Sequence, residues 1–254
     1  MRTFQLGWIF LAVVAICTLA CTSNLQVRKK QGAAARNLGE VYFGQGNYTE
    51  ALKEFLKAES LYPDDPFLQN DLGLTYKAKK KPDLAITHFK KALALKPDYV
   101  SAKNNLGTVY LDKKEWDAAI AYFKEVAESL VYASPHLPLS NLGWAYYNKK
   151  AYEQAEKYYL EALEIAPKFI NALRGLGLTY MAMGRIPESV EILESAAKEY
   201  PRTALLYFDL ATAYTLLHDY ESALNAYQKV EELAPKSALA REAGRAVQKI
   251  KHLE

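Results

Sequence analysis

The sequence predicts an all-α protein, a right-handed superhelical solenoid of six helix hairpins followed by a C-terminal capping helix. Three observations predict this fold. A leucine followed by a small residue recurs as NLGEVY, DLGLTY, NLGTVY, NLGWAY, GLGLTY and DLATAY. The small residues are separated by 34, 34, 36, 34 and 34 positions. A tyrosine follows each of them three residues later, and in five of the six copies a proline follows 24 residues later.

Each repeated position has a physical explanation. A glycine inside a helix costs about 1 kcal/mol relative to alanine, so a regularly placed one indicates close approach of a second helix. The alanine or serine twelve residues later is expected to be the small partner on that second helix, and the ring or leucine sixteen residues later to fill the space between hairpins. Proline lacks an N–H and ends the second helix. Each unit is therefore predicted to be a helix, a short turn and an antiparallel helix, and stacked units share one core.

This pattern resembles the tetratricopeptide repeat family. The resemblance divides the chain into units at 32–65, 66–99, 100–135, 136–169, 170–203 and 204–237. Residues 238–254 would form a helix that is charged on one side and apolar on the other, as expected of a capping helix. Family members bind other proteins along the concave face formed by the first helices, so the resemblance implies a non-catalytic binding scaffold.

The N-terminus has the features of an export signal. Arg2 precedes an apolar stretch from Leu6 to Ala20, which is short for a bilayer of about 30 Å and typical of a signal peptide over 1–20. Thr18-Leu19-Ala20-Cys21 looks like a lipoprotein cleavage site, which predicts lipidation of Cys21 and a polar tether over 21–31. An uncleaved signal anchor is the alternative.

Composition argues against several classes of chemistry. Without Arg2, 31 basic side chains face 29 acidic ones, so bulk charge gives no reason to expect a nucleic-acid partner. The four histidines are scattered, and Cys17 and Cys21 are the only cysteines. No nucleophile set, phosphate loop or metal-ligand spacing is found, so we expect no catalytic residue, metal, cofactor or small-molecule substrate. A hydrolase with an unrecognised site is the hypothesis from the enzyme class.

The third unit departs from the regular spacing. Its 36-residue interval has Val131 where a proline is expected, with Pro135 and Pro138 following, which predicts a longer elbow that changes the angle between the two halves. A tolerated loop insertion is the simpler alternative.

The elbow and the lipoprotein start together resemble the PilF/PilW-type pilotins of type IV pilus biogenesis. That resemblance implies a protein anchored to the outer membrane, facing the periplasm, that promotes assembly or localisation of a secretin subunit. Inner-membrane anchoring stays an alternative. The functional alternatives are an NlpI-like adaptor that recruits cell-wall hydrolases, or an assembly factor for another envelope complex.

The repeat class also implies which positions face the groove. The candidate partner-binding residues are Arg36, Asn37, Asn70, Asn104, Asn105, Asn141, Trp144, Tyr147 and Arg174. Asparagine can hold an extended backbone, although it is also simply common before Leu-Gly in such repeats. Trp144 and Tyr147 are candidates for an apolar anchor; burial against the fifth unit is the alternative.

Lysines recur in the turns between paired helices and are expected to form a basic ridge. They are Lys79, Lys80, Lys81, Lys113, Lys114, Lys149 and Lys150. An anionic surface or an acidic partner would bind such a ridge. The alternative is that these lysines only offset the helix macrodipole and keep the turns soluble.

Overall fold

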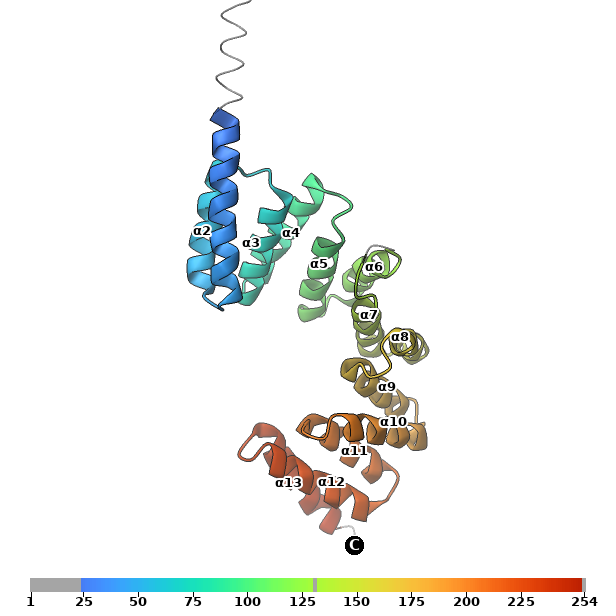
Figure 1. Cartoon of the computed structure of the whole chain (residues 1–254). Helices are drawn as coiled ribbons and strands as arrows, with labels where there is room; N and C mark the ends of the chain where they lie inside the picture. Colours follow the sequence, from blue (N-terminus) through green and yellow to red (C-terminus); the bar gives the residue numbers. More distant parts are fainter. Residues whose placement is uncertain (1–23, 130–131, 253–254) are drawn as a thin grey trace, which may run out of the picture. The chain divides into compact units, whose positions relative to one another are not determined.

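A computed structural model of the chain describes residues 24–129 and 132–252. Cys21 and the predicted signal segment lie outside these residues. The described part consists of helices joined by turns, without a strand, and confirms the all-α solenoid class (Figure 1). The chain forms two compact units, divided between Val109 and Tyr110; they are called the first and second compact unit, as distinct from the six repeat units.

The helices follow one another in pairs. In the first unit, a helix over 24–44 pairs with α2 (Tyr48–Leu61), and α3 (Pro66–Ala78) pairs with α4 (Pro82–Leu95). The division falls within α5 (Val100–Asp112), which is followed by α6 (Trp116–Ala127). The later elements are α7 (His136–Asn148), α8 (Tyr152–Ile165), α9 (Ile170–Ala182), α10 (Ile186–Glu199), α11 (Ala204–Leu216), α12 (Tyr220–Leu233) and α13 (Ala238–Lys251).

The first helix begins earlier than the sequence analysis suggests. Residues 24–31, assigned there to a polar tether, are helical and continue without a break to residue 44. Tertiary contacts explain this difference: Arg28 Nη2 donates to the Ser60 carbonyl at 3.1 Å, and Lys29 Nζ lies 4.7 Å from the centre of the Tyr62 ring. This end of the helix therefore packs on the end of α2 instead of forming a coil.

Every turn inside a hairpin has three residues, and the middle one has a positive φ. These middle residues are Gly46, Lys80, Lys114, Lys150, Gly184 and His218, with φ between 58° and 76°. The residue after each of them donates its N–H to the carbonyl of the repeated tyrosine, as in Lys81 to Tyr76 at 2.9 Å. This is the Schellman arrangement, which satisfies a free carbonyl at a helix end and requires a left-handed residue.

The repeated glycine makes room for the ring sixteen residues later. A Cβ at Gly73 would lie 2.6 Å from two ring carbons of Phe89, and one at Gly143 would lie 2.7 Å from Tyr159. The ring therefore packs against the glycine of its own hairpin, and not only between hairpins as the sequence analysis suggests.

The elbow of the third unit is longer than its spacing indicates. Eight residues, 128–135, separate α6 from α7. In every other hairpin, four residues separate the second helix from the helix that follows it. Half of this difference comes from α6, which has 12 residues where α4 and α8 have 14. Residues 130–131 lie outside the described residues, and the effect of the elbow on the angle between the halves stays a prediction.

Candidate functional site

A hollow opens between α7 and α9, which are the first helices of two successive hairpins in the second compact unit. Its volume is about 210 Å³, and it is lined by Ser140, Asn141, Trp144, Tyr159, Asn171, Arg174, Gly175 and Leu178. Three of the sequence-predicted groove residues, Asn141, Trp144 and Arg174, thus surround one hollow. The repeat spacing brings them together because α7 and α9 are the first helices of successive hairpins.

Trp144 lines the hollow and stacks on Tyr147, which is not among the lining residues. Their ring centroids are 5.5 Å apart and nearly parallel, at 13°, and Tyr147 also meets Tyr152 at 5.8 Å. Both side chains are half-buried, so neither full burial nor full exposure describes them. Stacking on Tyr147 orients the indole of Trp144, which therefore gives the hollow a rigid apolar contact surface.

The floor of the hollow is Tyr159, a residue of α8 that the sequence analysis assigns only to packing. A Cβ at Gly175 would lie 2.2 Å from Cζ of Tyr159, so glycine is required where α9 passes over this ring. Burial raises the pKa of the Tyr159 hydroxyl, which therefore stays protonated and able to donate a hydrogen bond. The signal for this floor was present as an extra glycine two residues before Gly177.

Arg174 is held at the rim by an ion pair with Asp209 of α11. The arginine is partly exposed, whereas Asp209 is buried. Burial raises the pKa of Asp209, although the hydrogen bond and the charge of Arg174 act in the opposite direction. The guanidinium is thus oriented by a buried partner and keeps donors available at the hollow.

In the first compact unit, the predicted asparagines have different roles. Asn70 is buried and its Oδ1 accepts a hydrogen bond from Asn105 Nδ2 at 2.9 Å, so this pair joins two first helices. Asn37 is exposed, and Oδ1 of the half-buried Asn104 has no hydrogen-bond partner among the residues described. Asn37 and Asn105 occupy the same repeat position, two residues before the glycine, yet Asn105 makes a packing contact and Asn37 is exposed.

Arg36 is the centre of a charged cluster. Its guanidinium lies 3.0 Å from Glu40, 2.9 Å from Asp65 and 3.7 Å from Asp71. Burial, together with the charge of Glu40, raises the pKa of Asp71 to about 7, and the charge of Arg36 opposes this. The predicted groove residue Arg36 is thus engaged by carboxylates of its own unit.

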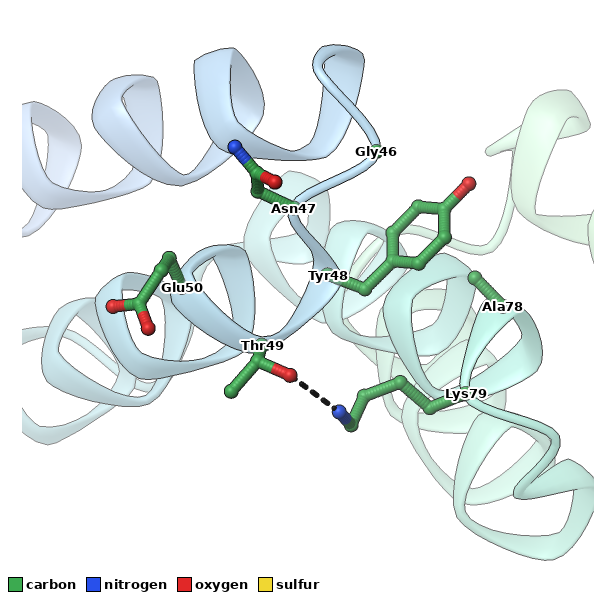
Figure 2. Close-up of a pocket in the computed structure, with 7 residues that line it drawn as sticks. All are labelled: Gly46, Asn47, Tyr48, Thr49, Glu50, Ala78 and Lys79. Carbon is green, nitrogen blue, oxygen red and sulfur yellow. Dashed lines mark hydrogen bonds between the residues drawn. The ribbon is translucent and has the colours of Figure 1, made fainter.

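The turn lysines of the predicted ridge also have local contacts. An open hollow of about 410 Å³ is lined by residues 46–50, Ala78 and Lys79. Figure 2 shows Lys79 reaching from the end of α3 to Thr49, where its Nζ donates to Thr49 Oγ1 at 3.0 Å. In the second unit, Lys149 pairs with Asp117, and Lys113 lies 3.0 Å from Glu115. Local contacts therefore offset part of the positive charge, and a continuous ridge stays a prediction.

Within residues 24–129 and 132–252, no cluster of side chains has the composition of a metal site. No helix in the same ranges is both long and apolar enough to span a bilayer.

The helix pairs, their turns and their glycine–ring contacts define a tetratricopeptide repeat protein. The chain belongs to this family: the family model "Tetratricopeptide repeat" matches residues 31–98, 98–168 and 169–236. No curated protein sequence matches the chain significantly.

Among solved structures, the chain is similar to two pilus proteins. PilW, a widely conserved type IV pilus biogenesis factor, has a TM-score of 0.77 at 20% identity, over 83% of this chain and 97% of PilW. PilF of Pseudomonas aeruginosa has a TM-score of 0.73 at 19% identity, over 86% of this chain and 99% of PilF. YrrB, a TPR protein with an unusual peptide-binding site, has a TM-score of 0.57 at 19% identity, over 75% of this chain and 97% of YrrB. The resemblance to the PilF/PilW type is thus confirmed at the level of the fold.

Proposed function

We propose that this chain is a lipid-anchored periplasmic scaffold that assists type IV pilus biogenesis by promoting assembly or localisation of an outer-membrane secretin subunit. Two findings support this proposal. Nearly the full lengths of PilW and PilF superpose on this chain. The sequence adds the cleavage pattern before Cys21 and the lengthened third unit.

The observation that carries a binding function is the hollow between α7 and α9. Its aromatic wall, Trp144, offers a rigid apolar surface, and aromatic side chains dominate the energy of protein interfaces. Asn141 and Asn171 lie beside it and can each donate to and accept from an extended backbone. This combination suits one apolar side chain of a partner segment, with its backbone held across the rim.

The test is affinity capture of the tagged, full-length protein from envelope extracts. A pilus secretin should be recovered with the unmodified chain. Trp144→Ala should reduce recovery about 30-fold, which corresponds to the ~2 kcal/mol expected of an interface anchor. The control is Leu160→Ala, which shortens an exposed leucine of α8 that does not line the hollow.

Thermal unfolding separates binding from folding in the same variants. An unchanged midpoint with lost capture supports an anchor, whereas a lowered midpoint with unchanged capture shows that Trp144 only packs. Consistent recovery of an amidase or endopeptidase without any secretin would contradict the pilus role and favour the hydrolase-adaptor alternative.

Membrane attachment is tested separately at Cys21. Because a thioether-linked lipid anchor needs the thiol, Cys21→Ser should move the protein from the membrane pellet to the soluble fraction. A Cys21→Ser protein that still pellets would show that an uncleaved signal anchor holds it instead.

A further inference from the structure

The first helix, residues 24–44, carries an uncovered apolar stripe. Val27 is 53% exposed, Leu38 43% and Val41 55%, and Ala34 is exposed between them. The intervals of 7, 4 and 3 residues place all four on one side of the helix.

The same repeat positions are buried in every later hairpin. The residues equivalent to Leu38 are Leu72, Leu106, Leu142, Leu176 and Leu210, with exposures from 0% to 6%. Those equivalent to Val41 are Thr75, Val109, Ala145, Thr179 and Ala213, with exposures of 0% or 1%. Those equivalent to Ala34 are Leu68, Ala102, Pro138, Ala172 and Leu206, and all are buried.

Among residues 24–129 and 132–252, no preceding hairpin covers this face of the first helix, so a stacking surface is left open at the N-terminal end. At other steps the preceding hairpin covers this face, as α2 covers α3 and α8 covers α9. The C-terminal end differs, because Ala243 and Ile250 of α13 pack against Ala223 and Val230 of α12. Repeat proteins normally close their ends with polar capping surfaces, so an apolar stacking face calls for a partner.

We propose that a second copy of this chain covers the stripe, with the two first helices packed antiparallel about a two-fold axis at Ala34. The stripe has the symmetry this requires. Ala34 is its midpoint, seven residues from both Val27 and Val41, so each valine meets the other valine of the second copy. Leu38 then lies over the aliphatic stem of Lys30. Such an interface is self-complementary and closes at two copies.

Charge favours the antiparallel arrangement. Arg28, Lys29 and Lys30 all lie at the start of the helix, so parallel packing would bring six cations together. Antiparallel packing separates the two basic ends by the length of the stripe, which is about 21 Å for 14 residues at 1.5 Å each.

A lipid surface is a weaker match to the stripe. Interfacial helices bury large side chains such as tryptophan, phenylalanine and leucine, with basic residues on their polar face. Here the stripe has two valines, one alanine and one leucine. Two of the three nearby cations are already engaged, because Arg28 donates to Ser60 and Lys29 lies over Tyr62.

The small residue at the centre sets a distance that can be tested. Helices packed at alanine have axes about 8–10 Å apart, and each Cα lies about 2.3 Å from its axis. The two Cα atoms of residue 34 would then be about 3.5–5.5 Å apart, which includes distances that a disulfide can span.

The experiment is cysteine cross-linking, with a mild oxidant added to accept the two electrons, of the purified full-length chain that carries Cys17→Ser and Cys21→Ser. In this background, Ala34→Cys should give at least ten times more disulfide dimer than Ala33→Cys. Ala33 is the matched control because it is also exposed but points away from the stripe. Adding Leu38→Lys to Ala34→Cys should reduce the dimer about tenfold.

A second pairing tests the register. When two differently tagged copies are co-expressed, Val27→Cys in one should cross-link to Val41→Cys in the other far more than Val27→Cys cross-links to itself. The proposal is overturned if Ala33→Cys and Ala34→Cys cross-link equally, or if neither forms dimer. It is also overturned if the Ala34→Cys product has a mass other than twice that of the chain, which would exclude a closed pair of copies.

Discussion

Replacing Asp71 by asparagine should remove much of the pH dependence of the stability of the first compact unit. Asp71 lies on α3 beside Arg36 and Glu40 of the first helix, and its Oδ2 is buried without a hydrogen-bond partner among the described residues. Burial and the like charge of Glu40 raise its pKa from the ordinary value of 3.8 to about 7. Asparagine keeps the size of the side chain but cannot ionise.

The direction in which stability changes with pH follows from proton binding. The folded state holds the proton of Asp71 more tightly than the unfolded state does, so its stabilising contribution is complete below pH 3.8 and is lost as the pH rises through about 7. A tenfold change in affinity corresponds to about 1.4 kcal/mol, so the full loss is about 4 kcal/mol. About 2 kcal/mol of it is lost between pH 5.5 and pH 8.

Urea unfolding at pH 5.5 and pH 8 measures this difference, provided that the slope with denaturant stays constant. Asp71→Asn should show a free energy of unfolding that falls by about 2 kcal/mol less than that of the unmodified chain over this range. Asp98→Asn is the control, because Asp98 is an exposed aspartate of the same unit and its replacement should change little. The reasoning is refuted if Asp71→Asn and the unmodified chain lose the same stability between the two pH values.

The other predictions concern glycine and turn positions. Gly175→Ala should lower the free energy of unfolding by about 1–3 kcal/mol, because its Cβ would overlap the buried Tyr159 ring; Gly44→Ala, where no atom lies within 4 Å of the new Cβ, is the control. Lys114→Gly should raise the free energy of unfolding by about 1 kcal/mol, because Lys114 has a φ of 61° that glycine adopts more easily. Gly184→Ala, at the same turn position with a φ of 76°, should lower it by a similar amount. Denaturant unfolding measures all four changes, and a destabilised Lys114→Gly would contradict the turn argument.

The fold was predictable because the repeat is local and redundant. Each hairpin has a small residue, a ring or a leucine sixteen positions later and a short turn, and this pattern occurs six times. Positions whose neighbours differ between copies were less predictable. Asn70 and Asn105 fit the groove pattern equally well, yet the packing of two first helices buries the former and makes the latter its hydrogen-bond donor. Residues 24–31 are polar or basic in sequence apart from Leu25 and Val27, and tertiary contacts with Ser60 and Tyr62 stabilise them as a helix.

The candidate site illustrates the same limit at the level of one side chain. The repeat places a ring at position 159 for packing, and phenylalanine serves that purpose at 55, 89 and 123. Tyrosine at 159 adds a hydroxyl, and Gly175 leaves room for it, because a Cβ at 175 would lie 2.2 Å from Cζ and 2.5 Å from the hydroxyl oxygen. These two residues both line the hollow, together with Trp144. Neither residue suffices alone, because a Cβ at 175 would overlap the tyrosine ring and a phenylalanine at 159 would bring no hydroxyl to the hollow. A functional site in a repeat protein can therefore be sought where two neighbouring units depart from the repeat at positions that the stacking brings into contact.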